Sequence, residues 1–224
     1  RIPPIKIVRR GILQEDIIRL VVNNTREPED RNLDLKVQIA TNDFGVIQTT
    51  KLIEKMGLEA MEVAVEDLLI YTSRRLKKHL LALKQGSSSF TTWMDDDGLE
   101  GQTLPLKANV KIENGHLLID FSGSGPQSRG AFNVMTTGVV ATVSYAVKAL
   151  LDPDLPANDG LYSVIQLNMP RGSILNPVYP AAVGARTTTC QKLAGAIFGA
   201  FAQLLKKEQI MASSHDVLAG ICLL

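Results

Sequence analysis

Residues 104–122, LPLKANVKIENGHLLIDFS, carry the clearest structural pattern in the chain. Before the dipeptide Asn114-Gly115, apolar and polar residues alternate with the period of two expected of a half-buried strand. The dipeptide tolerates the positive φ angles of a type I′ turn. Because a second apolar run follows at once, the sequence predicts a β-hairpin over 104–122.

The carboxylate of Asp120 closes this hairpin. Successive side chains of a strand point to opposite faces, so Asp120 is expected to point away from the face that carries Phe121. A glycine-punctuated polar loop with Ser122 follows and runs to Asn133. A carboxylate in this position can cap the loop through local hydrogen bonds or face a ligand, and the residue types leave both readings open.

The same loop invites comparison with a phosphate-binding loop. Gly125 and Gly130 have the spacing of that motif, but Ala131 and Phe132 stand where it needs Lys and Ser or Thr. The cation for the phosphates and the hydroxyl for a metal ion are both missing. We therefore predict no nucleotide loop here.

Length and composition bound the class of protein. The chain has 224 residues, of which 45% are hydrophobic and 21% charged, and a net charge of +1, so it is ordinary globular material rather than an electrostatic binder of nucleic acid. Cys190 and Cys222 form no zinc or disulfide pattern. With no apolar run of transmembrane length, we expect a soluble, cytoplasmic protein. Because the chain opens on Arg1 and not on Met, we also expect a fragment or a truncated chain.

The first part of the chain has helical periodicity. Helices are predicted for 14–22, from Pro28 to Gly57, and from there to about Gly86, with the last two forming an antiparallel pair. Residues 86–89 are predicted to be a short flexible joint, after which strands begin. The predicted fold class is thus α+β, with a mainly helical segment 1–85 and an α/β segment 86–224 built on the hairpin.

A basic cluster ends the second long helix. Its members are Arg74, Arg75, Lys77, Lys78 and His79. Cations at a helix C-terminus complement the helix dipole, so we expect a solvated face and not a polyanion site. His79 has no carboxylate or cysteine nearby at metal-ligand spacing and is expected to be exposed.

Two further helices are predicted downstream. Residues 135–151 are small and apolar nearly all round, which is typical of a buried helix. A last helix, capped by Thr188 or Thr189, carries Gly195 and Gly199 at a spacing that lets another element approach closely. The three histidines of the chain are scattered, so no catalytic triad and no metal site can be argued, and the residue chemistry alone defines no function.

An ordered series of short motifs nevertheless resembles the hydantoinase B/oxoprolinase family over nearly the whole chain. The motifs are Arg1-Ile2-Pro3-Pro4, Asn24-Thr25-Arg26-Glu27-Pro28, residues 34–40 (DLKVQIA) with Gly45, residues 119–124 (IDFSGS), Asn133, Asn158-Asp159-Gly160, Pro170-Arg171-Gly172-Ser173 and Gly184-Ala185-Arg186. Each motif alone is weak, and their order makes the match specific.

The resemblance implies the B-type subunit of an ATP-dependent hydrolase that opens hydantoin or 5-oxoproline rings. It implies an A-type partner subunit that binds ATP and phosphorylates the substrate, and hence a hetero-oligomer. It also implies catalytic roles for Asp120 and Ser122 and substrate binding by Asn133 and Arg186. Two alternatives stay open: part of the large subunit of an ATP-dependent ketone carboxylase, or a non-catalytic scaffold for subunit assembly.

The chain departs from the family pattern in several respects. It is shorter than a B-type subunit, it lacks the Gly-rich C-terminal portion, and it has Asn32 and Leu33 where the family tends to have Gly. The Asn-Asp-Pro-Tyr and Gly-Gly-Thr-His segments, which the resemblance assigns to a divalent-metal and catalytic site of the full-length subunit, are absent. No metal ligand is therefore predicted within this chain, and we expect the chain alone to be inactive.

Overall fold

The computed structural model describes residues 4–96, 99 and 101–205. The chain divides into two compact units, Arg1–Val65 and Glu66–Leu224, and each is described by itself. No helix of the described residues is both long and apolar enough to cross a membrane.

The first unit is a small hairpin followed by helices. Strands β1 (Val8–Arg9) and β2 (Ile12–Leu13) pair antiparallel and lead into α1 (Glu15–Val22), which packs on α2 (Pro28–Met56). Acidic residues open both helices, where they complement the helix dipole. The predicted helices of this segment are confirmed.

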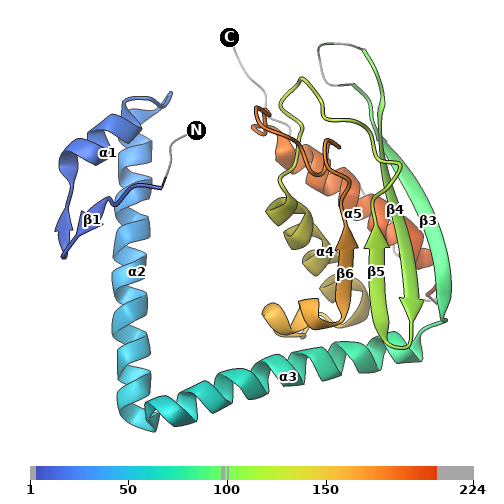
Figure 1. Ribbon diagram of the computed structural model, residues 1–224, viewed down its shortest axis with the longest axis horizontal. Helices are drawn as coiled ribbons and strands as arrows, with labels where there is room; N and C mark the ends of the chain where they lie inside the picture. The colour runs from blue at the N-terminus through green and yellow to red at the C-terminus, as the bar shows by residue number, and fades with distance from the viewer. Residues whose placement is uncertain (1–3, 97–98, 100, 206–224) are drawn as a thin grey trace. The chain divides into compact units, whose positions relative to one another are not determined.

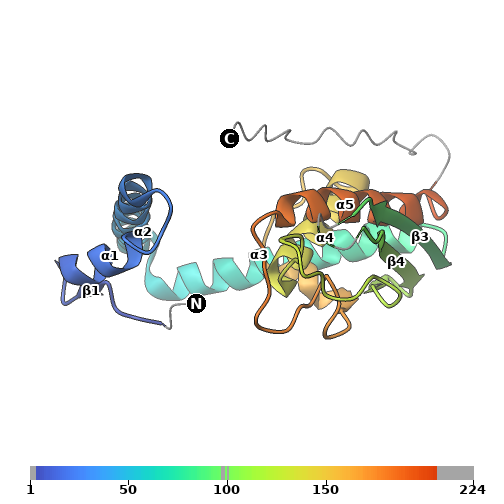
Figure 2. The same cartoon turned by 90° about the horizontal axis from the view of Figure 1, so that it is seen from above.

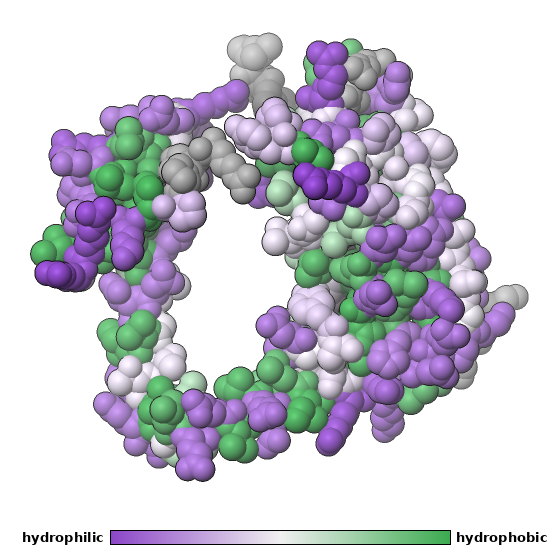
Figure 3. Space-filling view, viewed as in Figure 1, coloured by the Kyte–Doolittle hydropathy of each residue, from purple (hydrophilic) through white to green (hydrophobic). Residues whose placement is uncertain are grey.

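The two long helices predicted on either side of Gly57 are also present. Helix α2 ends at Met56 and α3 covers Leu58–Ala82, while Gly57 adopts a φ of 85° that favours glycine. No residue of α2 is buried, and green, hydrophobic patches alternate with purple along it in Figure 3. That the two helices pack as an antiparallel pair stays a prediction.

The second unit is built on a four-stranded sheet (Figure 1). The strand order is β3 (Gly86–Met94), β4 (Leu104–Glu113), β5 (His116–Asp120), β6 (Ile165–Asn168). The first three strands pair antiparallel, and β6 pairs parallel to β5. The α+β fold class is confirmed.

The predicted hairpin is confirmed as β4 and β5. Asn114 and Gly115, which join the two strands, have φ angles of 52° and 75°, as a type I′ turn requires. The alternation also holds, because Ile119 and Phe121 are buried while Asp120 between them is not.

The flexible joint predicted for residues 86–89 is wrong. These residues are the first part of β3, and they pair with Asn109–Ile112 of β4. The Ser88 hydroxyl also donates to the carbonyl oxygen of Ala200 at 2.7 Å. The backbone ladder of the long β4 strand outweighs the local turn preference of a Gly-Ser-rich stretch.

Helices cover one face of the sheet. Helix α5 (Arg186–Ala202) packs on β3, β4 and α4 (Thr136–Leu151), as Figure 2 shows. The core lies between these helices and the inward side chains of the strands, among them Leu106, Val110, Ile119, Phe121, Val143, Ile197 and Phe201. The opposite face of the sheet carries the polar half of each alternating strand.

The chain returns from α4 through a short 3₁₀ helix, η1 (Asp159–Ser163), to β6. This crossover makes β6 parallel to β5, so the carboxyl ends of the two strands lie side by side (Figure 1). Ligands of open α/β sheets bind at such carboxyl ends.

The capping role predicted for Thr188 or Thr189 is wrong. Helix α5 already begins at Arg186. Thr189 is buried inside the helix, where its hydroxyl donates to the carbonyl oxygen of Phe132 at 2.6 Å. The hydroxyl therefore ties α5 to the loop after β5 instead of ending a helix.

Candidate functional site

A hydrogen-bond network surrounds Asp120 at the carboxyl end of β5. Asn168, which ends β6, lies opposite Asp120 in the sheet register. Its Nδ2 donates to Asp120 Oδ1 at 2.8 Å, and the backbone amide of Ser122 donates to the same oxygen at 2.9 Å. The crossover thus joins two side chains that are 48 positions apart in the sequence.

Strand β4 holds the loop of this site in place. Asn109 Nδ2 donates to the carbonyl oxygens of Asp120 and Ser122, at 2.8 and 3.1 Å. The Ser124 hydroxyl accepts from the backbone amide of Lys107 at 3.0 Å and donates to its carbonyl oxygen at 3.3 Å. The Ser-Gly-Ser turn is therefore fixed on both sides to a long central strand.

These contacts set the charge of the site. Partial burial alone would raise the pKa of Asp120, but hydrogen bonds from Ser122 and Asn168 and the positive charge of Lys107 outweigh it. The net result is a pKa below the usual range of an aspartic acid, so Asp120 is ionised at neutral pH. As an anion it can accept a proton or a hydrogen bond, and it cannot serve as a resting proton donor.

A cleft of about 520 Å³ opens beside Asp120 on the outer face of the sheet. Its lining includes Ser87, Ser89, Asn109, Leu118, Asp120 and Gln203. Clefts of this size are typical of small-molecule sites. The carboxylate therefore borders a space that can hold a small ring.

The other two predicted site residues lie in a second loop cluster. Asn133 is fully buried: its Oδ1 accepts from the amide of Ser128, and its Nδ2 donates to the carbonyl oxygens of Ser128, Gly130 and Ala182. Arg186 is exposed at the start of α5, with Nη1 3.3 Å from the carbonyl oxygen of Val183. In this geometry Asn133 braces two loops, and substrate binding by either residue stays a prediction.

Sequence reasoning missed Lys107, Asn109 and Asn168. The signal for the first two was available, because the hairpin register places Asn109 directly opposite Asp120 on the same face. Asn168 gave no comparable signal, since only the crossover brings β6 beside β5. Topology, and not local pattern, completes this site.

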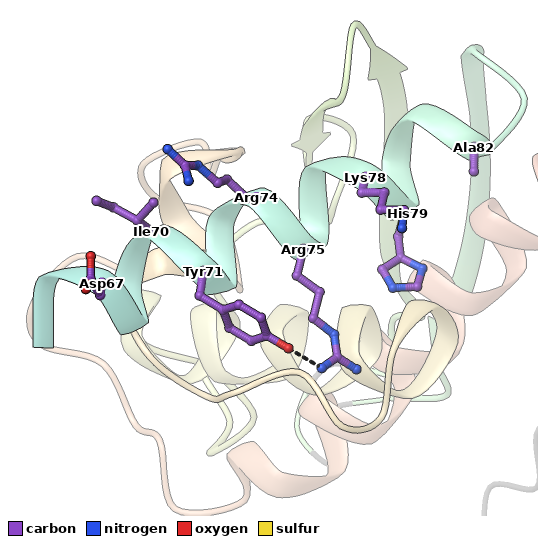
Figure 4. A pocket seen from close by; sticks show the side chains of 8 residues that line it. All are labelled: Asp67, Ile70, Tyr71, Arg74, Arg75, Lys78, His79 and Ala82. Carbon is purple, nitrogen blue, oxygen red and sulfur yellow. Dashed lines mark hydrogen bonds between the residues drawn. The ribbon is translucent and has the colours of Figure 1, made fainter. Parts of the chain in front are cut away.

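A second cavity, of about 640 Å³, runs along α3 (Figure 4). Arg75 on its wall is not simply solvated, as the basic cluster had been predicted to be. It forms a two-pronged ion pair with the buried Asp152, with Nη2 to Oδ1 at 2.7 Å, while its Nη1 donates to the Tyr71 hydroxyl at 2.8 Å. His79 is half-exposed, and its Nε2 lies 3.2 Å from Asp152.

This ion pair fixes α3 to the end of α4. The hydrogen bonds and charge of Arg75, together with His79, hold the pKa of Asp152 below its usual range despite burial. The partner of Arg75 lies 77 positions away, which is why the local charge pattern could not show it. Arg75 therefore has a structural role, unlike the solvated face that was predicted for the whole basic cluster.

Among the described residues, no three His, Cys, Asp or Glu side chains gather as metal ligands. Cys190 is half-buried, whereas Cys222 and His215 lie outside the described residues. The described side chains do not fit a divalent metal, so we derive no step through one.

Taken together, the fold and site define an α+β domain with a fixed carboxylate over a small cleft at the carboxyl end of a βαβ unit. Residues 1–223 match the family Hydantoinase B/oxoprolinase, and the chain belongs to that family. The family resemblance of the sequence is thereby confirmed.

The relatives named here are considerably longer than this chain. It is 35% identical over 202 residues to the uncharacterised protein MJ0963 of Methanocaldococcus jannaschii, which covers 89% of this chain and 35% of that protein. It is 32% identical over 209 residues to the 5-oxoprolinase of Dictyostelium discoideum, covering 88% of this chain and 16% of the enzyme. The chain thus spans about a third or less of these two relatives.

A solved structure shares the fold. The crystal structure of the ATP-dependent caprolactamase from Pseudomonas jessenii matches 92% of this chain and 36% of its own, with a TM-score of 0.84 at 24% identity. The caprolactamase subunit beta of that organism is 27% identical to this chain over 201 residues, 88% of this chain and 34% of the subunit. Relatives of this chain therefore include ATP-dependent enzymes named for the opening of cyclic amides.

Proposed function

We propose that this chain is part of the B-type subunit of an ATP-dependent cyclic-amide hydrolase that opens hydantoin or 5-oxoproline rings. Family membership and the names of the relatives support the reaction class. The observation that carries the proposal is the ionised Asp120, which Asn168 and Ser122 hold in the lining of a cleft large enough for a small ring.

The reaction needs ATP because a cyclic amide is stabilised by resonance. In the proposed scheme an A-type partner subunit binds ATP and transfers its γ-phosphoryl group to the carbonyl oxygen of the ring, releasing ADP. The "subunit beta" in the name of a relative supports a hetero-oligomer of this kind. Because ATP is the co-substrate, we place the complex in the cytoplasm.

Water then attacks the activated carbon. Expulsion of phosphate at this stage would regenerate the closed ring, so the ring nitrogen must leave. Breaking the carbon–nitrogen bond gives an amine and an acyl phosphate, and a second water converts the acyl phosphate to the acid and inorganic phosphate. One ring therefore consumes one ATP and two waters.

Asp120 and Ser122 have the catalytic roles in this scheme. The Asp120 carboxylate takes a proton from the attacking water and returns it to the departing nitrogen, which matches a group that is ionised at rest. Ser122 holds the carboxylate in position through its backbone amide. This assignment uses the carboxylate first as a base and only then as an acid.

Arg186 and Asn133 have supporting roles in the proposal. The exposed guanidinium of Arg186 suits a substrate carboxylate, such as that of 5-oxoproline, through a two-pronged contact. Asn133 acts through the loops that it braces, since its amide is engaged with backbone groups. In the proposed complex the loop cluster faces the substrate carboxylate.

The test is reconstitution of the full-length B-type subunit with its A-type partner. Hydantoin, N-methylhydantoin and 5-oxoproline are supplied with ATP, and the ring-opened acid and ADP are measured together. We expect one of the rings to yield acid and ADP in equal amounts, and the D120N variant to yield about 10²- to 10⁴-fold less acid.

The competing assignment has its own arm in this experiment. The same complex is supplied with acetone and bicarbonate in place of a ring. Turnover only under these conditions would replace the hydrolase by a ketone carboxylase, and D120N turnover equal to wild type with intact assembly would leave this region as a scaffold.

A further inference from the structure

The exposed face of α3 carries a short pattern with opposite charges at its two ends. An acid and a base flank two largely apolar side chains at symmetric spacing, in the order Asp67, Ile70, Tyr71, Arg74 (Figure 4). All four are exposed and line the cavity of about 640 Å³, whereas Leu76 on the other side of the helix is buried in the core. This face of α3 is therefore open to a binding partner.

The helix dipole does not account for the two charges. The dipole acts within the first and last turns of a helix, but Asp67 and Arg74 each lie more than two turns from the nearer end of α3. Among the residues that the structure describes, neither side chain forms an ion pair. They cannot pair with each other, because their separation along the helix is about 10 Å. Neither charge is compensated by its own helix.

Tyr71 is held in a fixed position at the centre of this face. Its hydroxyl accepts from Arg75 Nη1 at 2.8 Å, and the guanidinium carbon of Arg75 lies 5.9 Å from the centre of the ring. Arg75 is held in turn by the buried Asp152. Tyr71 is nevertheless 49% exposed, and Ile70 beside it is 37% exposed. A rigid aromatic side chain that is open to solvent is typical of the residues that dominate protein interfaces.

The pattern fits a second copy of the same helix that runs in the antiparallel direction. Reversal exchanges the two ends, so Asp67 of one copy lies opposite Arg74 of the other, and Ile70 lies opposite Tyr71. A two-fold axis repeats both contacts, which is the self-complementarity that a symmetric dimer interface requires. In a parallel arrangement the same pattern would bring like charges together.

We propose that this face of α3 docks a second copy of the chain in an antiparallel, two-fold arrangement, with Asp67 paired to Arg74 of the other copy at both ends. The A-type subunit would need no such symmetry, because a different chain can present any pattern of charges. The inference goes beyond the proposed ring-opening reaction and does not depend on it. It places two B-type subunits in direct contact within the assembled complex.

Charge reversals test the docking in the full-length subunit, without its A-type partner, by sedimentation equilibrium. D67R and R74D each bring like charges together at both ends and should raise the dissociation constant of the dimer at least about tenfold. The double variant D67R/R74D restores opposite charges and should dimerise as wild type does. R171D, a charge reversal in the exposed loop after β6, is the matched control for R74D and should leave the dimer unchanged.

Mixing the two single variants gives the sharpest outcome. In a heterodimer of D67R with R74D every charged contact is again between opposite signs. An equimolar mixture should therefore dimerise at concentrations where neither variant alone does, and native mass spectrometry should find one copy of each variant in the dimer. Circular dichroism of the variants should match wild type, because the altered side chains are exposed.

Three results would overturn the proposal: a monomeric wild-type subunit, unchanged self-association in both single variants, or no gain on mixing them. Loss of binding to the A-type subunit with self-association intact would also overturn it, because the face would then belong to that partner. None of these measurements involves ring opening, so a failure of the proposed reaction leaves their outcome unaffected.

Discussion

Asp120 is the residue to which the proposed function assigns proton transfer, and its environment sets the direction of the expected pH dependence. Its pKa lies below the usual range because Ser122, Asn168 and Lys107 favour the charged form over the effect of burial. A general base works only when deprotonated, so activity should persist into mildly acidic solution and fall only as pH drops through this lowered pKa.

Two substitutions test that view. D120N removes the base and should lower ring opening by about 10²- to 10⁴-fold. N168A removes one hydrogen bond from the charged form, which raises the pKa of Asp120 and moves the acidic limb of the pH profile to higher pH. Both are read from pH–rate profiles of the complex. An N168A profile that superimposes on wild type would show that the acidic limb reports another group.

Asn133 should matter for stability first. N133A removes, from a fully buried site, the hydrogen bonds of the Asn133 side chain with the Ser128 amide and with three backbone carbonyl oxygens. We expect a loss of about 2–4 kcal/mol of unfolding free energy in urea titrations. N24A, which removes an exposed side chain, should cost less than about 0.5 kcal/mol. Unchanged stability with reduced substrate affinity in N133A would favour direct binding instead.

The residues of the candidate site differ in whether local sequence pattern could predict them. Asp120 and Ser122 could be found from the sequence because a strand pattern ends there. Asn109 could have been found from the hairpin register. Asn168 could not, because its contact with Asp120 depends on a long crossover, and the partner of Arg75 was hidden for the same reason.

Two glycines, Gly160 and Gly199, lie where helices and strands approach closely. A Cβ on Gly160 would lie 2.3 Å from the carbonyl oxygen of Leu69 in α3, and one on Gly199 of α5 would lie 2.5 Å from the ring of Phe90 in β3. A backbone atom cannot yield, whereas the partly exposed Phe90 ring can turn aside. Gly160 therefore sets the approach of η1 to α3 more strictly than Gly199 sets that of α5 to β3.

Alanine substitutions rank these contacts. G199A should cost about 1–3 kcal/mol of unfolding free energy and G160A more than G199A. G45A, in the exposed middle of α2 with nothing within 4 Å, should instead gain up to about 1 kcal/mol. Urea titrations give all three values. A smaller cost for G160A than for G199A would mean that η1 moves freely on α3.

The Arg75–Asp152 ion pair, which joins α3 to the end of α4, makes a pH-dependent contribution to stability. The folded pKa of Asp152 lies below its unfolded value of about 3.9, so the ion pair stabilises the fold above that pH, and the contribution is lost as pH falls through the folded pKa. R75M removes the arginine that pairs with the buried Asp152 carboxylate and should melt below D152N at neutral pH. The difference should shrink in acid, where the carboxylate is protonated. Thermal melts at several pH values measure this, and a constant difference would contradict it.

Local pattern predicted the helices and the hairpin because each is specified by its own periodicity. The N-terminal half of β3 was missed because Ser-rich segments favour turns until a neighbouring strand supplies the ladder. The start of α5 was missed because Thr189 bonds to a distant loop and not to its own helix end. Tertiary contacts overrode local preference in both cases.

The molecule as a whole has one main hydrophobic core, and it lies in the second unit. Every member of the core cluster falls between Leu76 and Leu205, and among residues 4–65 the buried apolar side chains are only Ile18 and Val22. Residues 66–224 should therefore fold without residues 1–65. We expect a cooperative melt and unchanged amide resonances around Asp120 in the shortened chain, and a non-cooperative melt would show that the first unit contributes to that core.

The parallel pairing of β5 and β6 also affects the order in which the protein unfolds. β6 has four residues and lies at an edge of the sheet. Its backbone amide hydrogens should therefore exchange with solvent sooner than those of β4. Fraying of this short strand withdraws Asn168 from Asp120 while the hairpin is still intact. Under mild denaturation the reconstituted complex should therefore lose the proposed ring-opening activity before this domain loses its circular dichroism signal.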